Sequence, residues 1–371
     1  MKPNERPLLT AKQLKGRGAA ENPSGRYEAI NIEQLDASDP ATDWQPWPDA
    51  SDAPAKLQTR WRWETGRRLI NRVQSPDIAF NLSINPYRGC EHGCAYCYAR
   101  PSHAWLGLSA GIDFETRLIA RKNAAVLLRQ ELSASSYRPD AIAIGFNTDA
   151  WQPLEKSLGI TRSILEVLWE YRNPAAVISK ATLMLRDLDL LADMARLNLV
   201  HASVSLTTLD ARLNRLMEPR AASPSSRLHL IRKLSEAGIP VRVMIAPIIP
   251  GLTDHELEAI LEQAASAGAQ GAGYVLLRLP HELSELFPAW LQRHYPLRAG
   301  KVLAKLRRAR DGKLYDSTYK KRMSGTGKEA DFLKQRFDLA VKRLGLKKRG
   351  ETIPELDLSL FQTKSSHPTL F

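Results

Sequence analysis

Along the middle of the chain, short apolar runs alternate with longer stretches in which apolar residues recur every three or four positions. The short runs predict strands, and six of them lie at 80–86, 141–148, 175–180, 201–208, 240–251 and 271–280. The longer stretches predict helices at 123–132, 161–172, 185–197, 225–238 and 254–268. The middle of the chain is therefore predicted to repeat a strand–helix unit.

This repeat favours an α/β fold with a parallel sheet, because a crossover helix must return the chain to the start of each parallel strand. If the units curl round their strands, they make a barrel whose ligands bind at the carboxyl ends of the strands. Six units rather than eight predict a partial (β/α)6 TIM-like barrel. A doubly wound open sheet would show the same alternation, and the pattern alone leaves both architectures open.

The segments on either side lack the repeat. Residues 1–75 are rich in Pro, Gly, Ser and charge, which predicts a largely disordered or extended N-terminal segment. Within it, the run WRWETGRRLINR at 61–72 is typical either of a surface that stacks on bases and binds phosphates or of a short amphipathic helix. We expect the core domain at 76–280, a basic helical extension at 281–350 and a tail at 351–371.

The charge balance changes the picture of possible partners. The chain has 53 Lys and Arg residues against 40 Asp and Glu, a net charge of +13, which favours a polyanion such as DNA or RNA. In the C-terminal extension, one basic strip would either follow a phosphate backbone or form a solvated face of a helix: Arg307, Arg308, Arg310, Lys320, Lys321 and Arg322.

No apolar run approaches the roughly 20 residues that a membrane-spanning helix needs, so no membrane partner is expected. The first residues, MKPNERPLLTAKQLKGRG, lack the apolar centre of a secretion signal. Together with reduced thiols, these features predict a cytoplasmic protein.

All three cysteines of the chain lie within the sequence NPYRGCEHGCAYCYAR, as Cys90, Cys94 and Cys97. An odd number of clustered cysteines predicts metal ligation rather than disulfides. A structural zinc ion would need a fourth ligand, such as His92, His103 or a more distant histidine. A 4Fe-4S cluster held by three thiolates would leave one iron open for an exchangeable ligand. The cysteines alone leave both metals open.

The spacing C-x3-C-x2-C, with Tyr96 before the third cysteine, resembles the signature of the radical S-adenosylmethionine (SAM) enzymes. The resemblance implies a partial barrel of the radical SAM type, a 4Fe-4S cluster and SAM as cofactors. It also implies an external one-electron reductant, a flavodoxin- or ferredoxin-like protein. Reductive cleavage of SAM then gives methionine and a 5′-deoxyadenosyl radical that abstracts hydrogen from the substrate.

Within that superfamily, the chain is most similar to the spore-photoproduct-lyase-like branch, the DNA repair photolyase type. The stretches GCEHGCAYCYA, TDAWQPLE, VSLTTLDARLNRLMEPRAAS and VMIAPIIPG carry the resemblance, which spans about residues 76–280. It implies that the three cysteines ligate the cluster and that Tyr96 lies beside the adenine. It also implies cofactor-facing positions for Thr148, Lys180 and Ser205, and polar contacts to the amino-acid part of SAM, or to the loop holding it, for Glu155 and Arg220.

One departure from that branch concerns the hydrogen donor. In the lyase, a cysteine at the end of the second strand returns a hydrogen atom to the substrate radical, whereas this chain reads Gly145-Phe146-Asn147 in that region. Tyr96 and Tyr98 match a tyrosine pair that passes hydrogen in the same branch, and they are the candidate catalytic residues.

These observations give one leading hypothesis and two alternatives. The first is a radical SAM enzyme that abstracts hydrogen from a nucleic acid. The second keeps the radical chemistry but assigns a protein or a small molecule as substrate. The third is a non-catalytic, zinc-dependent nucleic-acid-binding protein.

Overall fold

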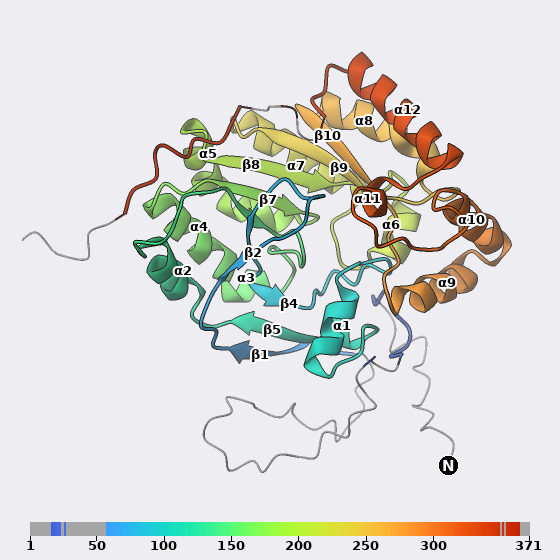
Figure 1. Cartoon of the computed structure of the whole chain (residues 1–371), viewed down its shortest axis with the longest axis horizontal. Coiled ribbons are helices and arrows are strands. Elements are labelled where there is room, and N and C mark those ends of the chain that lie inside the picture. The colour runs from blue at the N-terminus through green and yellow to red at the C-terminus, as the bar shows by residue number, and fades with distance from the viewer. Residues whose placement is uncertain (1–15, 24–25, 27–56, 349–350, 352–353, 364–371) are drawn as a thin grey trace, which may run out of the picture.

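A computed structural model describes residues 16–23, 26, 57–348, 351 and 354–363 of the chain (Figure 1). Its main feature is a seven-stranded sheet with the order β10-β9-β8-β7-β6-β3-β2. The six strands from β3 to β10 in this sheet run parallel, and β2 pairs antiparallel at one edge. The strands are β2 (Ile70–Arg72), β3 (Leu82–Ile84), β6 (Ile142–Ile144), β7 (Ala175–Ser179), β8 (Val200–Ser205), β9 (Val241–Ile248) and β10 (Gly271–Leu276).

The order of these strands decides between the two predicted architectures. Each parallel strand is added beside the one before it in the chain, whereas a doubly wound sheet reverses direction partway. The predicted α/β fold with a parallel sheet is therefore confirmed. Among the described residues no pairing joins β10 to β2 or β3, so a closed barrel is not formed.

The predicted helices of the repeat are also present. They are α2 (Ala124–Leu132), α4 (Ile160–Glu170), α5 (Leu188–Arg196), α7 (Pro224–Glu236) and α8 (Leu257–Ser266). Neighbouring helices contact one another in the order α2–α4–α5 and again at α7–α8, as successive units of one winding require. Shorter helices lie in the connections: η1 (Arg100–Leu106), α1 (Asp113–Thr116), α3 (Glu155–Leu158), η2 (Thr182–Asp187), α6 (Ala211–Met217) and η3 (Asp254–Glu256).

Local sequence explains where two helices of the fourth unit begin. The Asp210 carboxylate accepts hydrogen bonds from the backbone N–H groups of Arg212 and Leu213, which fixes the start of α6. Ser223 accepts from the N–H of Ser226 at the start of α7, with Pro224 in the first turn, where its missing N–H costs nothing.

A second, three-stranded sheet was not predicted. It has the order β1-β5-β4 and consists of β1 (Arg60–Glu64), β4 (Tyr87–Arg88) and β5 (Arg117–Arg121). The helix considered for 61–72 is therefore wrong, since this run contributes β1 and β2. In β1 exposure alternates with period two, so Trp61 and Trp63 point outward while Arg62 is half-buried, and parallel pairing with β5 stabilises the extended form.

The C-terminal extension is helical, as predicted. It contains α9 (Leu283–His294), α10 (Pro296–Arg308), α11 (Lys321–Ser324) and α12 (Lys328–Arg343). In Figure 1, α12 lies against α8, and Arg336 on α12 pairs with Glu258 on α8 at 2.5 Å. After α12, the N–H of Ala272 in β10 donates to the carbonyl of Lys347 at 2.8 Å, so the extension also pairs with the last strand of the sheet.

The predicted basic strip is not one exposed face. Arg310 is buried, Arg308 pairs with Glu329, and Arg322 pairs with Asp77 in the β2–β3 connection. Within the part of the chain that the structure describes, no helix is long and apolar enough to cross a membrane.

Candidate active site

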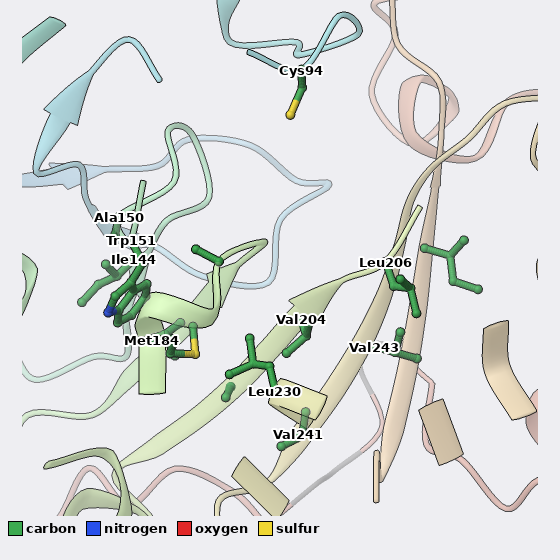
Figure 2. Close-up of a cluster of buried hydrophobic side chains, with 14 of the residues drawn as sticks. Cys94, Ile144, Ala150, Trp151, Met184, Val204, Leu206, Leu230, Val241 and Val243 are labelled. Atoms are coloured by element: carbon green, nitrogen blue, oxygen red, sulfur yellow. The ribbon is translucent and has the colours of Figure 1, made fainter. Parts of the chain in front are cut away.

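The loop with the three cysteines follows β3 and β4, as the predicted first strand requires. Cys90 and Cys94 are buried and Cys97 is half-buried. Backbone hydrogen bonds fix the loop at both sides, from the N–H of Cys90 to the carbonyl of Phe114 (3.0 Å) and from the N–H of Ala95 to the carbonyl of Met217 (2.9 Å). Figure 2 shows the Cys94 sulfur pointing away from its own loop toward the sheet.

A buried ion pair supports the loop from behind. The Arg100 guanidinium bonds the Glu115 carboxylate at 2.5 Å and donates from Nε to the carbonyl of Cys94 at 2.8 Å. The same carboxylate accepts the N–H groups of Gly18 and Ala19, which lie in the segment 16–23. A Cβ at Gly18 would lie 1.6 Å from the carbonyl oxygen of Gly93, so only glycine allows this approach to the cysteine loop.

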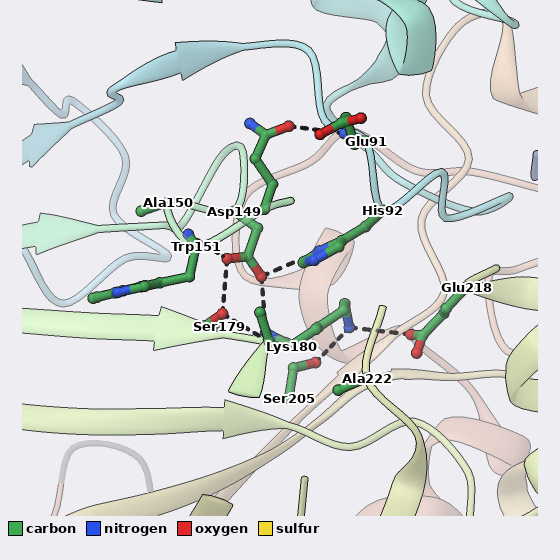
Figure 3. Close-up of polar contacts among 12 residues, drawn as sticks. Glu91, His92, Asp149, Ala150, Trp151, Ser179, Lys180, Ser205, Glu218 and Ala222 are labelled. Carbon is green, nitrogen blue, oxygen red and sulfur yellow. Dashed lines mark hydrogen bonds and ion pairs between the residues drawn. The ribbon is translucent and has the colours of Figure 1, made fainter. Parts of the chain in front are cut away.

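Asp149 joins the ends of two strands to the cysteine loop (Figure 3). One carboxylate oxygen accepts the N–H of Trp151 (2.9 Å) and the hydroxyl of Ser179 (2.7 Å). The other accepts the N–H of Lys180 (2.8 Å) and lies 3.4 Å from Nδ1 of His92. Burial lowers the pKa of His92, against the opposite effect of Asp149, so a neutral imidazole is favoured.

Lys180 reaches across the carboxyl ends of the next two strands. Its Nζ donates to the Ser205 hydroxyl at 2.6 Å and lies 3.2 Å from Oε1 of Glu218 and 3.4 Å from the carbonyl of Ala246. Burial lowers the pKa of the amine to about 8, while the nearby Cys94 opposes this shift.

Glu218 gathers the remaining polar groups of the site. The Tyr96 hydroxyl and the Thr207 hydroxyl both donate to its Oε1, the latter at 2.9 Å. Its Oε2 is paired with Arg227, which is fully buried and also donates to the carbonyl of Ser205 at 3.0 Å. Burial raises the pKa of Glu218, and Arg227 opposes that shift.

The structure thus brings together Tyr96, Lys180, Ser205 and the cysteine loop, but it places Thr148 and Glu155 in a different cluster. The Thr148 hydroxyl donates to the backbone carbonyl of Tyr87 at 2.7 Å. Glu155 accepts the Tyr87 hydroxyl, the N–H of Thr161 at 3.0 Å and the Arg186 guanidinium at 2.7 Å. These contacts join β4 to the chain after β6, and the predicted cofactor roles of both residues stay predictions.

Arg220 contacts the cysteine loop itself. The Arg220 guanidinium lies 3.0 Å from Oε1 of Glu91, and the Arg220 backbone N–H donates to the carbonyl of His92. These contacts tie Arg220 to the cysteine loop, and its predicted role toward SAM stays a prediction.

The two candidate tyrosines differ in exposure. Tyr96 is buried, whereas 42% of Tyr98 is exposed. The Tyr98 hydroxyl donates to the carbonyl of Phe146 just after β6, and the Arg278 guanidinium lies 4.9 Å from its ring. Gly145, at the same strand end, has a φ of +86°, and a Cβ there would lie 2.2 Å from the Ile178 carbonyl oxygen, so a side chain would not fit.

The donor set fits an iron–sulfur cluster better than a zinc ion. The two histidines considered for zinc have other neighbours: His92 faces Asp149, and Nε2 of His103 lies 3.0 Å from the carbonyl of Arg117. Among the described residues, no three His, Cys, Asp or Glu side chains form a site for a single metal ion. In a 4Fe-4S cluster each thiolate binds a different iron atom, so the sulfurs need not converge on one point.

Some residues of this site were missed by sequence reasoning. Arg227 and Arg100 hold Glu218 and Glu115, yet neither was a candidate. The sequence does contain a signal for Arg227. Leu230 and Ile231 follow it by three and four positions, so all three residues lie on the buried face of α7. A lone arginine in an apolar helical stripe predicts a buried carboxylate partner.

Comparison of the sequence with known proteins gives three findings. The sequence profile described as the Radical SAM superfamily matches residues 84–264. An uncharacterised protein of Mycobacterium tuberculosis (strain ATCC 25618 / H37Rv) is 38% identical over 233 residues, which cover 62% of this chain and 68% of that protein. The Radical SAM Nalpha-GlyT isomerase of Pseudomonas phage M6 is 25% identical over 59% of this chain and 43% of its own length.

The fold has a similar solved structure. A mutant of spore photoproduct lyase with bound AdoMet and dinucleoside spore photoproduct superimposes with a TM-score of 0.54 at 15% identity, covering 80% of this chain and 82% of that one.

Proposed function

This chain belongs to the radical SAM superfamily, and from that premise we propose that it is an enzyme that abstracts hydrogen from a nucleic acid with a 4Fe-4S cluster and SAM. The observation that carries the proposal is the position of the three cysteines, on one fixed loop, next to the Lys180–Ser205–Glu218 group at the strand ends. Ligands of this fold class bind at that end of the strands.

Cys90, Cys94 and Cys97 are proposed as the cluster ligands. When bound, the cluster and SAM supply reductive cleavage of a carbon–sulfur bond and thereby a 5′-deoxyadenosyl radical. Burial raises the pKa of all three thiols, so they need the positive charge of iron to remain thiolates. Radical SAM enzymes need an external reductant, and we propose a flavodoxin- or ferredoxin-like donor in the cytoplasm.

The charges of the site suit the amino-acid part of SAM. Glu218 contributes one negative charge between two cations, Arg227 and Lys180, so this group keeps a net positive charge. Lys180 and Ser205 are therefore proposed to bind the cofactor carboxylate, with the Tyr96 ring, 5.7 Å from Nζ of Lys180, beside its adenine.

Tyr96 and Tyr98 are proposed to pass the hydrogen atom. The chain has no cysteine outside the cluster motif, so a protein thiol is not available for that step. Tyr98 is the member of the pair that reaches the surface, and its hydroxyl is held at the end of β6. It is therefore proposed as the residue next to the substrate.

The nucleic-acid substrate rests on two supports. The chain has a net charge of +13. A similar structure contains a dinucleoside spore photoproduct. A protein or small-molecule substrate would instead leave oligonucleotide binding weak and insensitive to salt.

The test is cofactor cleavage by anaerobically reconstituted protein with dithionite as reductant. We expect iron and acid-labile sulfide in the protein and 5′-deoxyadenosine among the products. Cys94→Ala should abolish the product, whereas Ser135→Ala, a similar loss of one atom at an exposed position, should leave it unchanged. One zinc ion per chain without sulfide, or a fully active Cys94→Ala protein, would contradict the assignment.

A further inference from the structure

Arg310 carries a buried charge without a carboxylate partner among the described residues. Its side chain is 1% exposed, and its Nη2 donates to the backbone carbonyls of Leu277 (2.6 Å) and Arg322 (3.2 Å). Its Nε and Nη1 have no hydrogen-bond partner. A buried guanidinium that lacks an anion is costly, so such a group points to a ligand that supplies the negative charge.

A second arginine lies at the same strand end. Arg278 follows β10 by two residues, and its Nε is also buried without a partner. Its Nη1 makes one weak contact, to the sulfur of Met323 at 3.7 Å. Burial lowers the pKa of Arg310 and the charge of Arg278 adds to this shift, while Tyr315, whose ring lies 5.9 Å away, and Asp316 oppose it. The two guanidinium groups therefore act on each other.

Arg278 lies beside the proposed hydrogen-transfer residue. Tyr98 directly follows Cys97, its hydroxyl is bound at the end of β6, and its ring contacts Arg278 after β10. The third nearby arginine, Arg322, is already neutralised by Asp77 at 2.5 Å. Arg278 therefore remains as a positive charge without an ion-pair partner among the described residues, at the place where a substrate would approach Tyr98.

We propose that Arg278, with the buried charge of Arg310 behind it, binds a backbone phosphate of the nucleic-acid substrate next to Tyr98. The planar guanidinium fork matches two phosphate oxygens at once, and an anion there would relieve the uncompensated charge. This inference rests on the proposed function, because it locates that substrate relative to the radical site.

The experiment measures binding of a fluorescent oligothymidylate of about ten nucleotides to the reconstituted holoenzyme at several salt concentrations. Arg278→Gln should weaken binding about tenfold and make the slope of log K against log salt shallower by about 0.7, as loss of one single-strand phosphate contact does. Arg278→Lys should weaken it less. Arg298→Gln, the same charge change on the exposed side of α10, should leave binding within about twofold.

Two further measurements separate the possible outcomes. A peptide nucleic acid of the same sequence, which has no backbone charge, should bind wild type and Arg278→Gln equally. Equal oligothymidylate binding by Arg278→Gln and Arg298→Gln would overturn the proposal. The second measurement is the binding of inorganic phosphate. If Arg278→Gln weakens phosphate binding but leaves oligothymidylate binding unchanged, the proposal is overturned in favour of a site for free phosphate.

The proposed function fails separately from this inference. If wild-type protein cleaves SAM but its oligothymidylate affinity does not depend on Arg278, only the phosphate site is wrong. If wild-type protein does not cleave SAM, the radical assignment is wrong whatever the binding data show.

Discussion

Glu218 is the residue at which the charges of the site meet. It is fully buried, and its two oxygens face Lys180 on one side and Arg227 on the other. A buried carboxylate is tolerated only when its charge is paired and its lone pairs are used, which the Tyr96 and Thr207 hydroxyls complete. Lys180 is the accessible cation of this group, since 16% of its side chain is exposed while Arg227 has none.

Lys180→Met should therefore weaken SAM binding more than it weakens folding. Arg227 still neutralises Glu218 in this variant, so no carboxylate is left unpaired. Loss of a hydrogen bond to a charged group predicts that the Kd for SAM rises by about ten- to a hundredfold. Equilibrium binding of SAM to the reconstituted protein measures it, with Lys156→Met on an exposed position as the matched control. Equal Kd values for the two variants would remove Lys180 from the cofactor site.

His103 predicts a dependence of stability on pH. Burial lowers its pKa from 6.5 to about 4, Arg100 and Arg88 contribute in the same direction, and the Arg117 carbonyl and Asp113 oppose the shift. Between pH 6.5 and 4 the unfolded chain binds a proton that the folded chain does not, so stability is lost as pH falls. The expected loss through this residue is about 2 kcal/mol between pH 7 and pH 5.

Urea unfolding at the two pH values checks this prediction. His103→Gln should remove that part of the pH dependence, because its side chain does not titrate. His229→Gln, at an exposed position on α7, should keep it. An unchanged pH dependence in His103→Gln would show that the histidine is protonated equally in both states.

At the residue scale, sequence could predict what lies at a strand end but not its partners. Lys180 and Ser205 follow apolar runs, and such positions gather at one edge of a parallel sheet. Glu155 occupies a similar place in the sequence, yet Tyr87 and Arg186, from distant segments, direct it into another cluster. Which polar groups meet depends on long-range packing, and no local pattern records it.

At the scale of elements, the six parallel strands of the main sheet could be predicted because each is largely buried and reads as an apolar run, whereas the exposed edge strand β2 does not. The strands of the small sheet could not. β1 has the sequence RWRWE, and its extended form depends on pairing with β5. The paired residues are more than fifty positions apart in the chain, since Arg60 pairs with Arg117. Such a segment takes its structure from its partner rather than from its own composition.

The segment 16–23 is the element that covers the outside of the cysteine loop. Gly18→Ala would place a methyl group against the Gly93 carbonyl and displace the two N–H groups that bind Glu115. We expect the free energy of unfolding to fall by about 1–3 kcal/mol and the cluster to be lost faster in air. Urea unfolding and the decay of the visible absorbance of the cluster measure the two effects.

Gly300→Ala is the matched control for this element. A Cβ at Gly300 meets no atom within 4 Å, and the residue lies inside α10, where alanine is favoured over glycine by up to about 1 kcal/mol. It should leave cluster decay unchanged. If Gly18→Ala also leaves both quantities unchanged, the segment 16–23 does not protect the loop.

At the scale of the whole molecule, the C-terminal extension links the two edges of the open sheet. Its α11 contacts β10 at one edge (Figure 1). Near the other edge, Arg322 on α11 pairs with Asp77, and the N–H of Lys320 donates to the same carboxylate at 2.5 Å. The extension therefore connects both edges of the sheet next to the proposed phosphate site, where Met323 of α11 contacts Arg278.

The extension and the sheet should consequently unfold as one unit. Phe337 on α12 is 4% exposed and its ring lies 4.8 Å from that of Tyr274 in β10, so Phe337→Ala should cost about 3–5 kcal/mol and lower the Tm of the whole chain. Calorimetry should show a single transition, with the cluster absorbance lost at the same temperature. Leu339→Ala, on the same helix but 70% exposed, should change neither. Two separate transitions, of which Phe337→Ala shifts only one while the cluster stays bound, would show instead that the extension folds as a domain of its own.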